Sequence, residues 1–467
     1  MRNMRVFIVV ATFYPLVGGA ERQALEQGRS LRQKGLEATI VTFRHNKSWA
    51  AHDTIDGVPV IRIAGALLGG REKLPRVLQK LLYLMALLVM GWTLWRYRQR
   101  YDVLHVYQLN LLALATALSC VLSGKPMLAV VCSADPGGKD RSQDQISLIA
   151  GPLDAHSPML RVYQRTRARG DLADLERLGK PVVRFTRYLF QRINARVIIL
   201  STRMREYLAS HDFAFTDTGR DRRGGACPRL QPLRDPRNRP QGRDEPQPLR
   251  VPSGVDTSRF FPLSEGALDS QRSQTVVCTA RLSYEKGIDV LLQAWHLVHE
   301  ELPEARLVIA GTGPLRDQFA DMARALDLGE SVEFVGLQSD VPAVLHRGSI
   351  ATLPSRWEGL PNAILEAMSC GLPCVATRVS GTEDMITHGV NGLLVEPEDY
   401  HSMAQALLVL LRDPVRSSAY GKAARQIIEQ NYSLEHVTEI YVKLYQQMID
   451  DSKRISQKKS YEGQPLS

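Results

Sequence analysis

Residues 275–311 read TVVCTARLSYEKGIDVLLQAWHLVHEELPEARLVIAG. Apolar runs at 275–280 and 305–311 enclose a longer stretch, 286–301, that has the length and apolar spacing of a helix. Neither run alternates apolar with polar residues, which is typical of parallel strands that are covered on both faces. The stretch therefore predicts a strand, a crossover helix and a second, parallel strand.

The same plan continues along both halves of the chain. Further strands are predicted at 5–12, 37–43, 58–63, 102–107, 126–132 and 195–201, and at 332–336, 350–355 and 373–377. Helices are predicted at 20–34, 74–99, 110–122, 182–194 and 202–211, and at 314–327, 340–347, 361–370 and 397–412. Two such halves predict an α/β protein of two doubly wound, Rossmann-like domains that face each other across a cleft. In these sheets ligands bind at the carboxyl ends of the strands.

The overall composition is that of a globular protein that attracts anions. The chain has 467 residues, 44% of them hydrophobic and 23% charged, and a formal net charge of +10. This charge is compatible with nucleic acid, an anionic membrane or phosphorylated small molecules as partners. The six cysteines are scattered without the spacing of a metal site or a disulfide framework, so we expect neither.

Residues 81–95, LLYLMALLVMGWTLW, are the one candidate for contact with a membrane. This run of 15 residues falls short of the roughly 20 that span a bilayer, and Lys80 and Arg96 flank it. We therefore predict a helix that is either buried in the core or lies against a membrane surface. Both roles stay open, because a buried helix can also be apolar all round.

Residues 216–250 interrupt the pattern. They contain nine arginines, six prolines and no lysine, with almost no apolar periodicity, which predicts a disordered, solvated insertion. Two other interpretations stay open: an arginine-rich arm that binds nucleic acid or anionic lipid, and a stretch that is translated out of frame. The segment lacks the aromatic side chains that stack on bases, so we expect no nucleic-acid partner.

Two glutamates stand eight positions apart in WEGLPNAILE, residues 357–366. A strand is predicted to end near Ser355, and a helix to begin at Pro361, where proline is tolerated. Glu358 would lie in the turn beside the backbone N–H groups of the helix start, and Glu366 would project from the helix. A carboxylate accepts hydrogen bonds from two neighbouring hydroxyls, so the pair suits the sugars of a nucleotide-sugar. Alternatively, Glu366 is an exposed helix glutamate and Glu358 is an ordinary turn residue near a helix N-terminus.

Two further motifs place cations and glycines at strand–helix junctions. In ARLSYEKG, Arg281 follows a strand and Lys286 precedes a helix, so the two cations can neutralise a diphosphate. In FYPLVGGAERQ, Gly18 and Gly19 separate the first strand from the first helix and let a ligand approach the backbone. Each motif is weak by itself. The chain has no Walker A sequence and no Asp-x-Asp pair for a divalent metal, so no metal site is predicted.

In their order and spacing these motifs resemble one family, the retaining GT-B glycosyltransferases of family 4, also known as glycosyl transferases group 1. In the second half the resemblance rests on the two glutamates, ARLSYEKG at 280–287, IAGTGPL at 309–315 and SGTEDMITHGVNGLLV at 380–395. In the first half it rests on GGAER at 18–22, DVLHVY at 102–107 and VPSGVDTSRF at 251–260. The chain departs from the family at Cys132–Ser133, where many members have a His-Gly pair, and His105 is expected to be structural.

The resemblance implies a division into domains. Residues 1–262 would form the acceptor-side domain, with 216–250 as an irregular insertion. Residues 263–432 would form the domain that binds the nucleotide-sugar, 433–450 a helix that packs back across the domains, and 451–467 a polar tail.

The resemblance also implies roles for individual residues. The catalytic residues would be Glu358, which contacts the transferred sugar, and Arg281 and Lys286, which hold the donor diphosphate as it leaves. Glu366 would bind the ribose hydroxyls. The other donor-binding residues would be Gly18 and Gly19 near the phosphates, the backbones of Gly359, Leu360 and Asn362, and Gly311, Gly313 and Gly336 around the base. No metal or other cofactor is implied, and the anomeric configuration would be retained.

The implied activity is transfer of a hexose-type sugar from a UDP- or GDP-sugar to a glycan or lipid-linked acceptor. Such an enzyme would build a cell-surface polysaccharide or glycolipid, in the cytoplasm or at the inner face of the plasma membrane. Its partners would be the donor, the acceptor and, peripherally, an anionic membrane. The alternative is a non-catalytic GT-B protein that binds nucleotide-sugar or serves as an assembly partner. A sugar-nucleotide epimerase of the same fold fits the ordered motifs less well.

Overall fold

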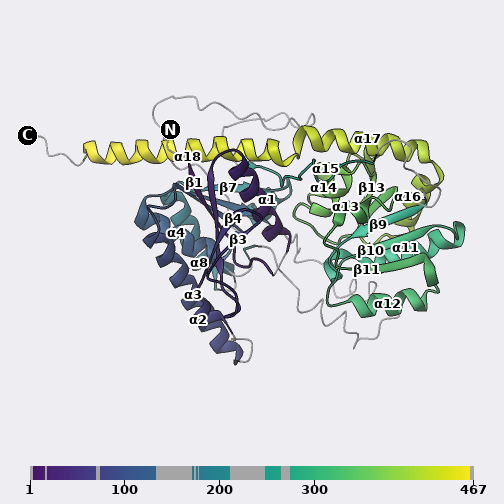
Figure 1. Cartoon of the computed structure of the whole chain (residues 1–467), viewed down its shortest axis with the longest axis horizontal. Helices are drawn as coiled ribbons and strands as arrows, with labels where there is room; N and C mark the ends of the chain where they lie inside the picture. Colours follow the sequence, from purple (N-terminus) through teal and green to yellow (C-terminus); the bar gives the residue numbers. More distant parts are fainter. Residues whose placement is uncertain are drawn as a thin grey trace, which may run out of the picture. The chain divides into compact units, whose positions relative to one another are not determined.

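The computed structural model describes residues 4–15, 18–69, 74–132, 171–172, 175–176, 178–210, 248–263 and 274–462. The chain divides into two compact units, and Figure 1 labels most of their helices and strands. Unit 1 comprises Met1–Cys132, Asp171–Val251 and Leu444–Ser467, and unit 2 comprises Ser133–Gly170 and Pro252–Lys443. Most of the insertion predicted at 216–250 lies outside the described residues.

Unit 1 is built on an eight-stranded sheet in the order β3-β4-β2-β1-β5-β6-β7-β8. Its strands are β1 Arg5–Val9, β2 Glu37–Phe43, β3 His52–Ile55, β4 Val58–Ile63, β5 Val103–Tyr107, β6 Met127–Val131, β7 Arg196–Ile199 and β8 Leu249–Arg250. Neighbouring strands run parallel, except that β3 pairs antiparallel with β4. Every apolar run predicted as a strand in the first half lies in this sheet, so the prediction of a parallel sheet is confirmed.

Strand β3 was not predicted from the sequence. Its four residues are mostly exposed and polar, as is typical of an edge strand. The turn into β4 nevertheless carries a recognisable signal, because Asp56 and Gly57 both adopt positive φ angles, of 48° and 78°. An Asp-Gly pair of this kind is the preferred turn of a tight β-hairpin.

Helices pack on both faces of this sheet. The described helices of unit 1 are α1 Gly19–Gln33, α2 Gly65–Leu68, α3 Arg76–Arg96, α4 Leu111–Ser123, α8 Lys180–Arg192 and α9 Met204–Ser210. Helix α1 packs on β2 and β4, whereas α4 packs on β5 and β6 and contacts both α3 and α8. The strand order runs one way from β1 to β2 and the other way from β5 to β7. Right-handed crossovers therefore place α1 and α4 on opposite faces.

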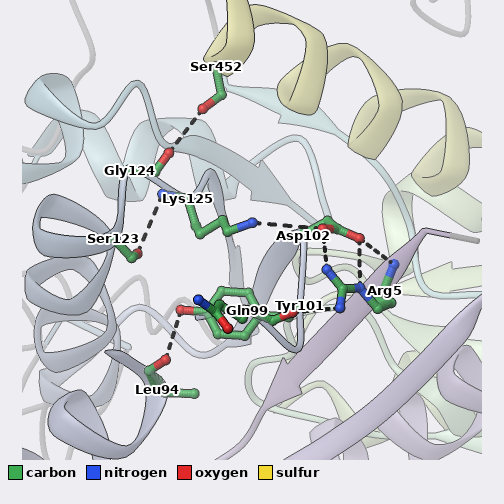
Figure 2. Close-up of polar contacts among 9 residues, drawn as sticks. All are labelled: Arg5, Leu94, Gln99, Tyr101, Asp102, Ser123, Gly124, Lys125 and Ser452. Atoms are coloured by element: carbon green, nitrogen blue, oxygen red, sulfur yellow. Dashed lines mark hydrogen bonds and ion pairs between the residues drawn. The ribbon is translucent and has the colours of Figure 1, made fainter. Parts of the chain in front are cut away.

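A polar cluster joins the amino ends of β1 and β5, as Figure 2 shows. The backbone N–H and Nε of Arg5 donate to Oδ2 of Asp102 at 3.1 and 3.2 Å, and Nη2 donates to Oδ1 at 2.9 Å. Lys125 places Nζ 3.7 Å from the same Oδ1. Burial raises the pKa of Asp102, but the hydrogen bonds from Arg5 and the charges of Arg5 and Lys125 hold that pKa below its ordinary value. The hydroxyl of Tyr101 donates to the Leu94 carbonyl at 3.1 Å and so ties the end of α3 to the sheet.

Unit 2 is built on a six-stranded, fully parallel sheet in the order β11-β10-β9-β12-β13-β14. Its strands are β9 Thr275–Thr279, β10 Arg306–Ala310, β11 Val332–Gly336, β12 Ile350–Leu353, β13 Cys374–Thr377 and β14 Gly392–Val395. The first five coincide with predicted strands. The two sheets confirm an α/β protein of two doubly wound domains.

Helices enclose the sheet of unit 2. They are α11 Ile288–Glu301, α12 Arg316–Ala325, α13 Val341–Leu345, α14 Asn362–Ser369, α15 Thr382–Met385, α16 Tyr400–Arg412 and α17 Pro414–Asn431, with short 3-10 turns η2 Tyr284–Lys286 and η3 Gly329–Ser331. Helix α17 was not predicted, although Asp413 caps it by accepting from the Arg416 N–H and Pro414 occupies its first position. Both are ordinary signals of a helix start.

The crossing from unit 1 to unit 2 lies earlier than predicted. The chain leaves unit 1 after Val251, whereas the sequence placed the boundary at 262. The intervening segment belongs to unit 2 because it bonds to α17 and its C-cap residue: the Val255 N–H donates to the Tyr432 carbonyl at 2.9 Å, and the side chain of Arg425 donates through Nη1 to the Phe260 carbonyl at 2.8 Å. Apolar patterning does not reveal these hydrogen bonds.

The C-terminal helix is longer than the sequence predicted. Helix α18 runs without interruption over Leu434–Glu462, so it includes most of the segment predicted as a polar tail. Its residues up to Lys443 belong to unit 2 and those from Leu444 to unit 1. Within unit 1, the hydroxyl of Tyr445 lies 2.5 Å from Nδ1 of His105.

Candidate functional site

The predicted site residues of unit 2 follow the carboxyl ends of neighbouring parallel strands. Strand β10 leads to Gly311 and Gly313, β9 leads to Arg281 and Lys286, and β12 leads to Glu358. Because β9 lies between β10 and β12, these loops come to one edge of the sheet although they are far apart in sequence. This edge is where doubly wound sheets bind their ligands.

An ion pair between Lys286 and Glu358 is the centre of this edge. Nζ of Lys286 lies 2.5 Å from Oε1 of Glu358, and the Ser355 hydroxyl donates to the same oxygen at 2.6 Å. The side chain of Glu358 is only 9% exposed. A carboxylate buried to this degree needs a cation or hydrogen-bond donors, and the two neighbours supply both. Lys286 ends η2, and Gly287 at φ 64° separates it from α11.

Glu366 is also buried, at 5% exposure, within α14. The alternative that Glu366 is an exposed helix glutamate is therefore wrong. The helix begins at Asn362, one residue later than predicted, because Pro361 is extended and caps it. The turn before it is tightly packed: Gly381 adopts φ 83°, and a Cβ there would lie 2.4 Å from the Gly359 carbonyl oxygen.

The glycines after β10 are needed for close packing of two loops. Gly311 adopts φ 143°, and a Cβ there would lie 1.8 Å from the carbonyl oxygen of Ala280. A Cβ on Gly313 would lie 2.2 Å from the carbonyl oxygen of Leu282. The Gly311 N–H donates to the Gly336 carbonyl at 2.8 Å, which connects the ends of β10 and β11. These contacts explain the glycines through packing, and their place around a nucleotide base stays a prediction.

Arg356 is a residue of this site that sequence reasoning missed. Its guanidinium is buried and donates to Asp289 at 2.9 and 2.7 Å, to Glu398 at 2.6 and 3.0 Å, and to the Tyr284 carbonyl at 2.7 Å. It also lies 4.0 Å from the ring centroid of Tyr284. Burial lowers the pKa of Arg356, but the charges and hydrogen bonds of Asp289 and Glu398 raise that pKa by more, so the guanidinium stays protonated.

This arginine connects the two loops that carry the ion pair. Arg356 precedes Glu358 by two residues, and Tyr284 precedes Lys286 by two residues. The Arg356 N–H also donates to the Glu285 carbonyl at 2.8 Å. The guanidinium therefore holds the loop after β12 against the turn after β9. No spacing rule marks it, since an arginine in a loop is usually exposed.

The remaining predicted residues are placed as follows. Arg281 is exposed after β9. Gly18 and Gly19 belong to unit 1, where the Gly18 N–H donates to Glu21 at 2.9 Å and the Thr12 hydroxyl donates to the same carboxylate. Their place beside the donor phosphates stays a prediction. Among the described residues, no group of three or more His, Cys, Asp or Glu side chains is arranged to hold a metal ion.

The position of His105 agrees with the structural role expected for it. The imidazole is fully buried in unit 1 and stacks on Tyr107, with ring centroids 4.7 Å apart. Burial lowers the pKa of His105 to about 3, so the ring is neutral at physiological pH.

Comparison with known families agrees with the fold. Residues 273–413 match the family described as Glycosyl transferases group 1, and residues 18–218 match the Glycosyl transferase 4-like domain. The two matches together span most of the chain. The chain belongs to the group 1 glycosyltransferases, and its fold is GT-B.

Individual relatives extend this comparison. The GDP-mannose-dependent monoacylated alpha-(1-6)-phosphatidylinositol monomannoside mannosyltransferase of Corynebacterium glutamicum is 32% identical over 202 residues, which are 40% of this chain and 52% of that protein. The chain thus spans about half the length of the curated relatives it matches.

Solved structures show the same fold over nearly the whole chain. Sucrose-phosphate synthase from Thermosynechococcus elongatus has a TM-score of 0.65 at 18% identity, over 96% of this chain and 100% of that one. The Anabaena protein HepE, solved in complex with UDP-glucose, has a TM-score of 0.63 at 16% identity, over 95% of this chain and 100% of that one.

Proposed function

We propose that the protein transfers a hexose-type sugar from a nucleotide-diphosphate sugar to a glycan or lipid-linked acceptor, with retention of anomeric configuration and without a metal. The observation that carries this proposal is the ion pair of Lys286 and the nearly buried Glu358 at the carboxyl edge of a doubly wound sheet. Family membership supports the class of reaction, and a relative that uses GDP-mannose supports the class of donor.

The ion pair suits a donor whose sugar is linked directly to its diphosphate, because the ammonium can contact the phosphates while the carboxylate contacts the sugar. An ammonium has three N–H donors, so Lys286 can hold Glu358 with one and phosphate oxygens with the others. Both hydrogen bonds to Glu358 use Oε1, which leaves Oε2 for a sugar hydroxyl, as far as the described residues show. The exposed Arg281 adds a second positive charge at the same edge.

Transfer proceeds by attack of the acceptor hydroxyl on the face from which the diphosphate leaves. The departing phosphate oxygen accepts the proton of the hydroxyl, and Lys286 and Arg281 stabilise the negative charge that develops on it. Glu358 faces the positive charge that develops at the anomeric carbon. Glu366, which is buried in α14, binds the ribose hydroxyls through its carboxylate.

We place this activity in the synthesis of a cell-surface polysaccharide or glycolipid, in the cytoplasm at the inner face of the plasma membrane. The name of the Corynebacterium relative includes a phosphatidylinositol acceptor, which supports a lipid-linked acceptor. The competing proposal is a GT-B protein that binds nucleotide-sugar without catalysis, and turnover separates the two.

Nucleotide binding is the first test. Calorimetric titration with UDP, GDP and ADP should show binding of one nucleotide, and Glu366→Ala should weaken that binding by at least about tenfold, since two charge-assisted hydrogen bonds are lost. Exposed Glu330→Ala is the matched control. Binding that is equally strong in the Glu366→Ala variant would show that this carboxylate does not hold the ribose.

Turnover is the second test. The donor is the nucleotide-sugar of whichever nucleotide binds. Its sugar should be transferred to a lipid-linked or glycan acceptor in the presence of a chelator. Nuclear magnetic resonance should show the donor's anomeric configuration in the product. An inverted product would refute the retaining mechanism. Nucleotide-sugar binding without transfer to any acceptor of a broad panel would favour the non-catalytic alternative.

A further inference from the structure

An apolar stripe runs along the exposed side of α3. The stripe consists of Val77, Leu81, Leu84, Leu88 and Trp92, which are spaced three or four residues apart and are between 42% and 72% exposed. Only 22% of the apolar 18-residue window within Val77–Arg96 is buried, so α3 is not the core helix that the sequence left open. By length and composition the segment is also sufficient to cross a membrane.

Two further helices of unit 1 also expose apolar side chains. Helix α4 contacts both α3 and α8. It exposes Leu118 and Leu122, and α8 exposes Phe185 and Tyr188. Scattered exposed apolar residues are ordinary, but a continuous stripe of five exposed apolar residues along one helix marks an interaction surface.

The charges of these helices have one sign. Helices α3, α4 and α8 contain no aspartate or glutamate, whereas α3 has three cationic residues and α8 has four. Lys80, Arg184 and Arg192 are exposed. An apolar face on helices that carry cations and no carboxylates is complementary to a surface that is apolar inside and anionic outside, which describes a bilayer with anionic lipids.

The carboxyl end of α3 has the composition of a membrane interface. The guanidinium of Arg96 lies 5.5 Å from the ring of Trp92, that of Arg98 lies 4.6 Å from Trp95, and that of Arg100 lies 4.8 Å from a tyrosine ring. Tryptophan and tyrosine concentrate at the level of lipid headgroups, where arginine meets phosphate.

We infer that the outer face of α3, together with the exposed apolar side chains of α4 and α8, binds the surface of a bilayer that contains anionic phospholipid. Helix α3 lies along the surface with its stripe among the acyl chains and its cations at the headgroups. The inference deepens the proposed function and rests on it in one respect: membrane binding would bring the enzyme to a lipid-linked acceptor. The face itself is independent of donor chemistry, because it belongs to unit 1.

Two other occupants fit these observations less well. A second copy of the chain related by twofold symmetry would set the cations of one face against those of the other. A membrane-spanning α3 would have to leave unit 1, yet Ala86, Leu87, Met90 and Leu94 are at most 5% exposed on its inner side. The hydrogen bond from Tyr101 to the Leu94 carbonyl also holds its end.

Vesicle co-sedimentation of the full chain tests the inference. We expect binding to phosphatidylcholine vesicles that contain about a third phosphatidylglycerol, weaker binding to phosphatidylcholine alone, and release at high salt. The triple variant Leu81→Gln, Leu88→Gln, Trp92→Gln should lower the partition coefficient by more than about a hundredfold, since each apolar side chain that enters the acyl region contributes about tenfold. The matched control is Val390→Gln, Val409→Gln, Val415→Gln, which removes three exposed apolar residues from unit 2.

The outcomes separate the inference from the proposed function. Equal vesicle binding by both triple variants, or no binding by the unmodified chain, would overturn the inference. A concentration-dependent dimer in ultracentrifugation that only the α3 variant abolishes would also overturn it. So would vesicle-bound protein that alkaline carbonate does not release, because this would indicate a membrane-spanning helix. Thermal melting verifies that both variants fold. Calorimetric nucleotide binding by the same preparations tests unit 2, so its failure beside intact vesicle binding would count against the proposed function alone.

Discussion

Replacing Arg356 by methionine removes the guanidinium that joins the two loops of the candidate site. The substitution keeps the length of the side chain but deletes all five hydrogen bonds to Asp289, Glu398 and the Tyr284 carbonyl. Removing one partner of a buried ion pair costs about 3–5 kcal/mol, because the remaining charge stays buried without compensation. The penalty falls mainly on Asp289, whose side chain is 12% exposed, since Glu398 at 28% can regain water.

This free energy converts into a measurable change in melting temperature. For a unit of roughly 200 residues, 1 kcal/mol corresponds to about 2–4 °C, so unit 2 should melt about 6–20 °C lower. Differential scanning calorimetry measures the transition, and hydrogen–deuterium exchange of residues 284–289 should rise in the same variant. The matched control is Arg412→Met, which removes an ion pair with Glu301 that is about half exposed on both sides. That pair is worth at most about 1 kcal/mol, or less than about 4 °C.

The comparison has a clear refuting result. If Arg356→Met melts within the range of Arg412→Met and its exchange at 284–289 is unchanged, the buried guanidinium does not hold the two loops together. A variant that melts lower while Arg356→Lys matches the unmodified protein would show that charge alone suffices. We expect the lysine variant to melt lower as well, because one ammonium cannot form two forked pairs.

Three further predictions concern the charges and glycines. Glu358→Gln should keep the shape of the side chain but lose the charge that pairs with Lys286. We expect kcat to fall about a hundredfold, with a smaller change in nucleotide affinity. A kcat equal to that of the unmodified protein would remove Glu358 from the catalytic residues. The pKa of Asp102 is lowered in the folded state, so its stabilisation is present above the ordinary carboxyl pKa and is lost as the pH falls through the lowered value. Asp102→Asn should therefore flatten the acid limb of a plot of melting temperature against pH, and an unchanged limb would contradict this assignment. Gly311→Ala should prevent the packing of the loop after β10 and lower both the melting temperature and the nucleotide affinity. The control is Gly329→Ala, where a Cβ would meet nothing within 4 Å and only backbone strain is expected. Equal effects of the two substitutions would contradict the packing role of Gly311.

The sequence predicted the parallel strands well because each is a continuous apolar run, and burial on both faces requires that pattern. It missed β3 because an exposed edge strand has no such requirement. It missed α17 although the Asp413 cap and Pro414 are readable signals. The early boundary at Val251 depends on hydrogen bonds between distant segments, which composition does not record.

For the candidate site, the sequence specified which residue types stand at the strand–helix junctions. The two glutamates, the two cations after β9 and the glycine pair could all be named from spacing and family resemblance. Spacing could not show that Glu358 is nearly buried and paired with Lys286. The two residues are 72 positions apart in sequence, and they meet because β9 and β12 pair in the sheet.

The sequence by itself determined the class of fold, the family and the chemistry available at the carboxyl edge of the second sheet. These follow from local patterns, since apolar periodicity and motif order are properties of the chain as written. Only the tertiary structure decided that Arg356 is buried and that the apolar helix α3 exposes one side. Burial depends on which distant elements pack against a residue: Arg356 is covered by Tyr284 and Glu398, whereas α3 packs against α2 and α4 and leaves its apolar stripe exposed.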